Sequence, residues 1–130
     1  MELIAYLGSG KGTWGQVNAL FKLGEWEKVY VICNDFSYDK FEVPKSDTYV
    51  KLKLNEKKLE EEYKRLSDYF KEHIKDIEVA LNVNSGTGME YMALLSALLR
   101  AGLGIRFVYA EFDELKEFSI FDRPFISEEE

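Results

Sequence analysis

Residues 3–13 of the chain read LIAYLGSGKGT, a short apolar run that passes directly into a glycine-rich segment. An uninterrupted apolar run of this length is typical of a strand buried on both faces, and Gly8 predicts the turn that ends it. From Trp14 to Leu23 the apolar residues recur at helical spacing. The start of the chain therefore predicts a strand, a glycine-rich loop and a helix in direct succession.

The same succession occurs again later in the chain. Residues 79–83 predict another buried strand, residues 84–89 a loop with two glycines, and residues 90–100 a helix that is apolar nearly all round. We also expect two buried strands at 29–33 and 105–109, an edge strand with one wet face at 48–54 and an amphipathic helix at 59–77. Residues 34–48 are expected to form a long connection, and no element is clear after Glu111. Buried strands alternating with helices predict an α/β fold. We expect a single Rossmann-like domain over residues 1–130, with a mostly parallel sheet and helices on both of its faces.

The composition narrows the possible functions. Of the 130 residues, 46% are hydrophobic, which is enough for a packed core, and no apolar run is long enough to span a membrane. The net charge of −7 argues against a general DNA- or RNA-binding surface, which needs clustered Lys and Arg. Cys33 is the single cysteine and His73 the single histidine, so neither a metal site nor a cofactor is predicted.

The two ends of the chain carry different signals. The N-terminus has no basic region before its apolar run, so we expect no signal peptide and a cytoplasmic protein. Residues 112–130 hold seven acidic side chains against two basic ones. Such a charge run is typical of a solvated surface, and its part in any site is left open.

Both glycine-rich loops follow a strand and open a helix. In a parallel sheet the carboxyl ends of the strands meet at one edge, where ligands bind, so we expect the two loops to lie together. Bare N–H groups at a helix N-terminus attract phosphate. The sequence therefore predicts a site for a phosphate-bearing ligand, and the expected ligand-binding residues are Gly8, Ser9, Gly10, Lys11, Gly12, Thr13, Asn34, Asn84, Ser85, Gly86, Thr87, Gly88 and Met89.

The second loop also has a purely structural interpretation. Gly86 and Gly88 permit a tight turn between strand and helix, and Ser85 or Thr87 can cap the helix. Glu90 either caps the same helix or repels anions. It is the presence of two such loops at one sheet edge that favours a ligand.

Two further residues have alternative interpretations. Asn34 ends a strand at the expected ligand edge, where a ribose contact and a simple turn are equally compatible with the sequence. Trp14 could stack on an adenine, but its helical spacing favours core packing.

The first loop half-resembles the phosphate loop of nucleoside monophosphate kinases. The pattern G-x-x-x-x-G-K-[ST] would need glycine at position 5 and Ser or Thr at position 12, whereas Ala5 and Gly12 stand there. The residues between belong to the predicted strand. A small P-loop-like nucleotide enzyme is therefore kept as the third hypothesis.

Residues 81–95, LNVNSGTGMEYMALL, resemble the second motif of the CRISPR-associated Rossmann-fold (CARF) domains, in which an apolar strand runs into a small-residue loop and then an apolar helix. The first strand with residues 8–12 resembles the other ligand loop of that family. The resemblance implies a homodimer whose paired sites form one pocket for a cyclic oligoadenylate, the messenger of type III CRISPR antiviral defence. An apolar helix over 90–100 is what such a dimer interface would require.

Some members of this family are ring nucleases, which cleave the messenger without metal. The resemblance implies that the ribose 2′-hydroxyl is the nucleophile, so the protein supplies orientation and charge stabilisation. The lysine often found in the second motif is absent, since Gly88 and Met89 stand around its position. Lys11 and Ser9 are therefore the candidate catalytic residues, with a binding-only sensor or sponge acting on a separate partner as the alternative.

Overall fold

The computed structural model describes residues 1–83 and 86–118. In this part of the chain six strands form one sheet in the order β3-β2-β1-β4-β5-β6. Every neighbouring pair is parallel except β5 with β6. The strands are β1 (Glu2–Leu7), β2 (Lys28–Cys33), β3 (Tyr49–Lys53), β4 (Glu78–Val83), β5 (Gly104–Glu111) and β6 (Glu114–Glu117). The prediction of a mostly parallel sheet is confirmed.

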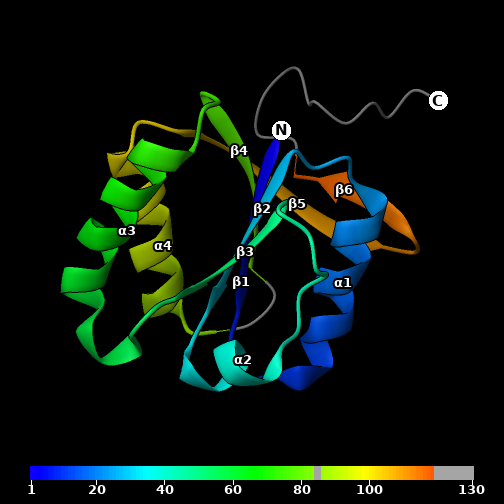
Figure 1. Cartoon of the computed structure of the whole chain (residues 1–130), viewed down its shortest axis with the longest axis horizontal. Helices are drawn as coiled ribbons and strands as arrows, with labels where there is room; N and C mark the ends of the chain where they lie inside the picture. Colours follow the sequence, from blue (N-terminus) through cyan, green and yellow to red (C-terminus); the bar gives the residue numbers. More distant parts are fainter. Residues whose placement is uncertain (84–85, 119–130) are drawn as a thin grey trace.

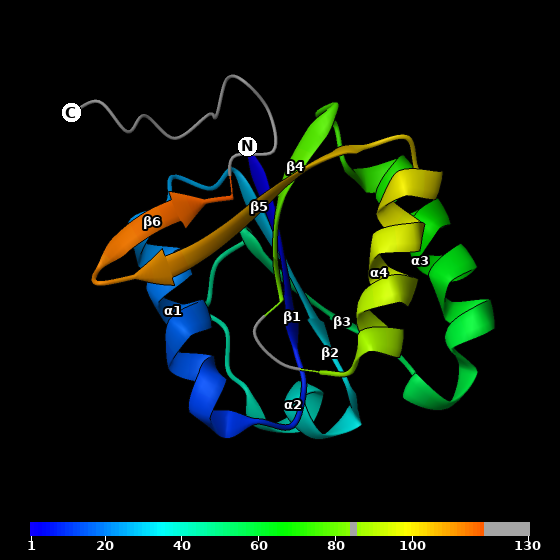
Figure 2. The ribbon, with the colours of Figure 1, turned by 180° about the vertical axis from the view of Figure 1, so that it is seen from behind.

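Helices cover both faces of this sheet. The α-helices are α1 (Trp14–Leu23), α2 (Asp35–Lys40), α3 (Leu59–His73) and α4 (Gly88–Arg100), and the short 3-10 turns are η1 (Lys11–Thr13) and η2 (Glu56–Lys58). α3 and α4 pack side by side on one face, and α1 lies on the other (Figures 1 and 2). The predicted α/β architecture, with helices on both faces, is therefore confirmed.

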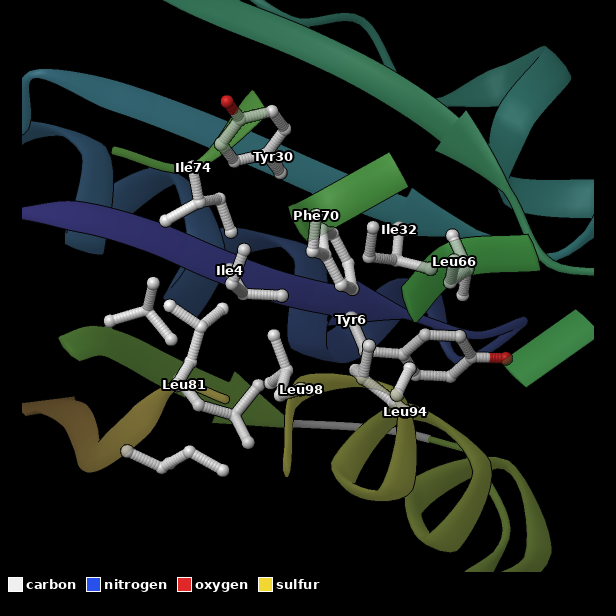
Figure 3. Packing of buried hydrophobic residues seen from close by; sticks show 14 of the residues in the cluster. Ile4, Tyr6, Tyr30, Ile32, Leu66, Phe70, Ile74, Leu81, Leu94 and Leu98 are labelled. Carbon is white, nitrogen blue, oxygen red and sulfur yellow. The ribbon is translucent and has the colours of Figure 1, made fainter. Parts of the chain in front are cut away.

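The two-sided cover explains why the central strands are apolar throughout. On β1, Ile4 and Tyr6 face α3 and α4, whereas Leu3 and Leu7 face α1, and all four are buried. Figure 3 shows the first of these two layers, with Ile4 and Tyr6 packed among apolar side chains from the helices. Burying each large apolar side chain contributes roughly 1.5–3 kcal/mol, so this alternation fixes β1 at the centre of the sheet.

The edge strand β3 was predicted with one wet face, and it does form the edge. Val50 and Leu52 pack on the α3 side. On the other side, the Lys51 ammonium donates to the backbone carbonyls of Tyr38 and Phe41. The apolar and charged residues of β3 therefore alternate because one side of this edge strand packs against α3 and the other side carries lysines.

The prediction of a plain connection over 34–48 is wrong, because α2 lies within it. Asn34 Oδ1 accepts a hydrogen bond from the Ser37 N–H at 2.8 Å, and Ser37 Oγ accepts one from the Asn34 N–H at 3.1 Å. The two bonds form a capping box. Ser37 Oγ also lies 2.7 Å from the Leu7 carbonyl, to which it donates. This tie to β1 stabilises a helix too short to form by itself.

Two other boundaries differ from the prediction. The amphipathic helix ends at His73, and Ile77, which was assigned to it, is 83% exposed. β6 was not predicted, because the turn before it contains no glycine. Phe112 and Asp113 instead take positive φ values of 51° and 59°. Residues 119–130 of the acidic C-terminal segment lie outside the described residues.

None of the helices in the described part of the chain is both long and apolar enough to cross a membrane.

Candidate functional site

The strands β1, β2, β3 and β4 end at the same edge of the sheet because they run parallel. β1 and β4 are neighbours, yet the chain passes from β1 outward to β2 on one side and from β4 outward to β5 on the other. A crevice opens beyond the strands where connections diverge in this way, and ligands of open α/β sheets bind there. The two glycine-rich loops follow these two strands, so the fold brings them together at that position.

The first loop is closed by its own polar groups. The Thr13 N–H and hydroxyl both lie within hydrogen-bonding distance of the Gly10 carbonyl, at 3.0 and 2.8 Å. Ser9 and Gly10 are exposed, whereas Gly8 is buried. A Cβ at Gly12 would meet nothing within 4 Å, so this glycine is not required by crowding. The backbone of Lys11 belongs to η1, while its side chain lies outside the described part of the structure.

Two neighbours of this loop have structural roles. Trp14 donates from Nε1 to the Gly8 carbonyl at 3.3 Å and packs edge-on against Phe41, as its helical spacing predicted. Ala5 pairs within the sheet, between β2 and β4. The position at which a kinase phosphate loop would begin is therefore a strand residue.

Asn34 joins the first loop to the end of β2. Its Nδ2 donates to Ser9 Oγ at 3.0 Å, while its Oδ1 accepts the capping bond from Ser37. The residue is only 3% exposed. These contacts, which belong to the turn between β2 and α2, account for the buried Asn34 amide, and Ser9 is the more exposed member of the pair.

The second loop is built around a glycine that cannot be replaced without strain. Gly86 has a φ of +108°, and a Cβ there would lie 2.5 Å from the Tyr6 ring and 2.8 Å from Glu90 Oε1. Thr87 caps α4, since its Oγ1 accepts from the Glu90 N–H and Glu90 Oε1 accepts from the Thr87 N–H, both at 3.3 Å. Asn84 and Ser85, which were expected to bind the ligand, lie outside the described residues.

The first turn of α4 begins at this edge of the sheet and is exposed. Residues 86–89 are all exposed, and the helix begins at Gly88. The first amides of a helix have no acceptor within it, and they carry the positive end of the helix dipole. Thr87 takes up only the amide of Glu90, so the end of α4 retains the capacity to bind an anion.

Sequence reasoning missed a polar network beneath this loop. The Tyr6 hydroxyl donates to Glu90 Oε1 at 2.6 Å, and Glu90 is only 5% exposed. In Figure 3 the oxygen of Tyr6 points out of the apolar cluster. Burial, together with the neighbouring Glu90 carboxylate, raises the pKa of Tyr6 above the usual range of a phenol. The capping interpretation of Glu90 is confirmed, but the uninterrupted apolar run of residues 3–7 gave no sign that Tyr6 would contact Glu90.

Glu56 extends this network across the edge of the sheet. The residue is exposed as a whole and begins η2, directly after β3. Burial of the carboxyl and its contact with Glu90 raise the pKa of Glu56, against an opposing effect of Asn34. No sequence pattern singled out Glu56, because its role depends on contacts between separate loops.

Lysines lie at the same edge, where η2 leads into α3. A surface cavity of about 640 Å³ is lined there by Lys57, Lys58, Leu59, Glu60, Glu61 and Lys64. Its three lysines outnumber its two acids, so the edge offers some positive charge beside Glu56.

No protein-family model matches the chain, and no curated protein matches it. Its function is therefore inferred from the geometry of the site.

Proposed function

We propose that the chain binds a cyclic oligoadenylate at a pocket completed by a second copy of itself, and cleaves the ring without a metal. The observation that carries this proposal is the convergence of two glycine-rich loops at the adjacent carboxyl ends of β1 and β4. Each loop leads into a helix, and such helix ends bind phosphate through backbone amides. Two of them at one crevice suit a ligand with several phosphates.

The exposed face of α4 supports the dimer. Met89, Met92 and Leu99 lie on this helix and are 61%, 59% and 60% exposed. Their spacing of three and seven residues places them along one stripe. A contiguous exposed apolar patch is typical of a protein interface. Because α4 starts at the second loop, a copy packed on this face would bring two crevices near each other, as a symmetric ring requires.

The proposed reaction needs orientation more than a strong nucleophile. The ribose 2′-hydroxyl attacks the adjacent phosphorus, so the protein has to hold the attacking and leaving oxygens in line and stabilise the developing charge. Ser9 is exposed next to Asn34, and Lys11 is the single lysine within residues 8–13. These two residues are the proposed contacts to the scissile phosphate.

A binding-only sensor or sponge is the second candidate. It is favoured by the sequence of the second loop, where Gly88 and Met89 stand around the position at which the second motif of the resembled family often has a lysine. Such a protein would hold the ring intact and act through a separate partner.

The test is chromatography of cyclic tetra-adenylate and cyclic hexa-adenylate after incubation with the protein in chelator. We expect conversion to linear products, with turnover at catalytic amounts of protein. Lys11→Ala should reduce turnover by roughly 10²–10³-fold, the usual cost of removing a charge-stabilising group. Lys22→Ala, which removes the same charge from the last turn of α1 at the opposite edge, should not.

The other outcomes separate the alternatives. Intact rings in a tight complex would establish the binding-only protein. Turnover that needs Mg²⁺ would favour the P-loop-like enzyme, whereas no complex with either ring would refute the proposal.

A further inference from the structure

A second hollow lies at the edge of the sheet opposite the crevice. A surface cavity of about 470 Å³ opens there, between the end of α1 and the starts of β2 and β3. In Figure 1 this edge lies near the N-terminus, whereas the carboxyl ends of β1 and β2 lie near α2. The lining residues are Phe21, Gly24, Glu25, Trp26, Glu27, Ser46, Thr48 and Tyr49. Pockets for small molecules span roughly 300–1,000 Å³, so this cavity is large enough for a small ligand.

Three aromatic residues make up the apolar part of the lining. Phe21 is 8% exposed, and its ring centroid lies 5.1 Å from that of Tyr49, with the two planes inclined by 59°. The third ring is that of Trp26, whose Nε1 donates to the Leu20 carbonyl at 2.7 Å. The indole also lies against Gly24, where a Cβ would come within 2.3 Å of it. Trp26 is thus fixed in place, and it contributes ring surface to the cavity and not a hydrogen-bond donor.

The charged residues of the lining are both acids, Glu25 and Glu27. Glu27 Oε1 lies 2.6 Å from the amino group of Met1, which compensates its charge. Within the part of the chain that the structure describes, no ion pair joins Glu25 to a cation. The carboxyl end of α1 adds the negative end of a helix dipole. The cavity therefore favours a positively charged ligand.

Aromatic rings together with a carboxylate suit one kind of cation best. Cations are attracted to the faces of aromatic rings, and quaternary ammonium groups are the ligands most often held in this way. Such a group carries its charge on methyl groups and has no N–H. A primary ammonium, by contrast, is strongly hydrated and presents three donors that need acceptors. A cavity lined by three rings and few acceptors therefore favours the quaternary group.

We infer that this cavity binds the quaternary ammonium group of a small molecule of the choline type. Phe21, Trp26 and Tyr49 surround the methyl groups, and Glu25 supplies the opposite charge. The site is independent of the proposed function, because it lies at the other edge of the sheet and its ligand needs no phosphate. Failure of the ring-cleavage assay would leave this inference standing, and the converse also holds.

The experiment is an NMR titration of the full chain with choline chloride, followed through the indole N–H signals. Trp26 reports on the cavity, whereas Trp14, whose Nε1 donates to the Gly8 carbonyl at the other edge, is the internal reference. The uncharged analogue of choline, in which carbon replaces the nitrogen, keeps the shape and removes the charge. Sodium chloride at the same concentration controls for ionic strength. We expect a saturable shift of the Trp26 signal with choline, and roughly tenfold weaker binding of the carbon analogue.

Two variants separate the contributions of the ring and the charge. Tyr49→Leu keeps an apolar side chain but removes a ring, and it should weaken choline binding by roughly two- to fivefold while the carbon analogue binds as before. Glu25→Gln removes an exposed charge without disturbing the core, and it should also weaken choline binding by roughly two- to fivefold. Glu72→Gln is the matched control, since it removes an exposed carboxylate from the last turn of α3, on the other face of the sheet, and should leave the affinity unchanged.

Several outcomes would overturn the inference. Trp26 shifts that are absent, or that sodium chloride reproduces, would show that the cavity holds no choline. Equal affinities for choline and its carbon analogue would show an apolar hollow without preference for a cation. Wild-type affinity in Glu25→Gln, an exposed position at which the fold should persist, would exclude this carboxylate as the partner of the ammonium group.

Discussion

Replacing Gly86 by alanine should strongly destabilise the protein. The backbone there has a φ of +108°, which an L side chain rarely adopts, and the new Cβ would lie 2.5 Å from the Tyr6 ring. Neither conflict can be relieved locally. Tyr6 is 1% exposed in the centre of the sheet, and Glu90 Oε1, at 2.8 Å from the Cβ, is held by the Tyr6 hydroxyl.

Several costs contribute to the expected effect. Backbone strain at a residue forced into a sparsely populated conformation costs about 1–3 kcal/mol. Forcing a methyl group into a filled core costs about 1–3 kcal/mol more. If the loop moves to relieve the clash, the bond between Tyr6 and Glu90 is stretched, and a hydrogen bond to a charged group contributes about 1.5–3 kcal/mol. We expect a loss of about 3 kcal/mol or more.

Urea denaturation followed by circular dichroism measures this difference directly. Gly12→Ala is the matched control, because a Cβ at Gly12 meets nothing within 4 Å and should change the free energy of unfolding by less than about 1 kcal/mol. Equal midpoints for Gly86→Ala and the wild type would refute the packing of Tyr6 against the second loop.

Other regions give three shorter predictions. Gly24→Ala should lower the free energy of unfolding by about 1–3 kcal/mol, because its Cβ would lie 2.3 Å from the Trp26 ring. That ring is held in place by a hydrogen bond from Nε1 to the Leu20 carbonyl. An unchanged melting temperature in thermal denaturation would contradict this prediction. Met92→Lys should yield monomers in analytical ultracentrifugation while circular dichroism stays native, and a dimer that persists would exclude this face. Cys33 should resist thiol reagents at neutral pH until the protein unfolds, because burial raises the pKa of its thiol; rapid labelling of the native protein would show that β2 opens.

The sequence was informative wherever apolar residues set the structure. Continuous apolar runs correctly predicted the buried strands, and Lys51 and Lys53 correctly marked β3 as an edge. The helix at α2 escaped prediction because its stability comes from Ser37 reaching the Leu7 carbonyl, a contact that no local pattern reveals. β6 escaped because residues other than glycine form its turn.

The candidate site, like the fold, could be predicted only in part. Its backbone features were visible in the sequence, since glycines after strands predict turns and helix ends, and the capping role of Thr87 followed from local spacing. The bond between Tyr6 and Glu90 was not visible, because these two residues, one on β1 and one on α4, meet only once the helix packs on the sheet. Side-chain chemistry built from several loops needs the topology first.

The lysines of β3 also bear on how copies of the chain can associate. An exposed edge strand presents unpaired backbone groups to any other strand, which invites continuous sheets and aggregation. Lys51 is anchored to the carbonyls at the end of α2, and Lys53 lies 3.7 Å from Asp35 Oδ1, so charge is concentrated along this edge. A neighbouring strand would have to desolvate that charge to pair with β3. Edge-to-edge growth is thereby disfavoured at β3.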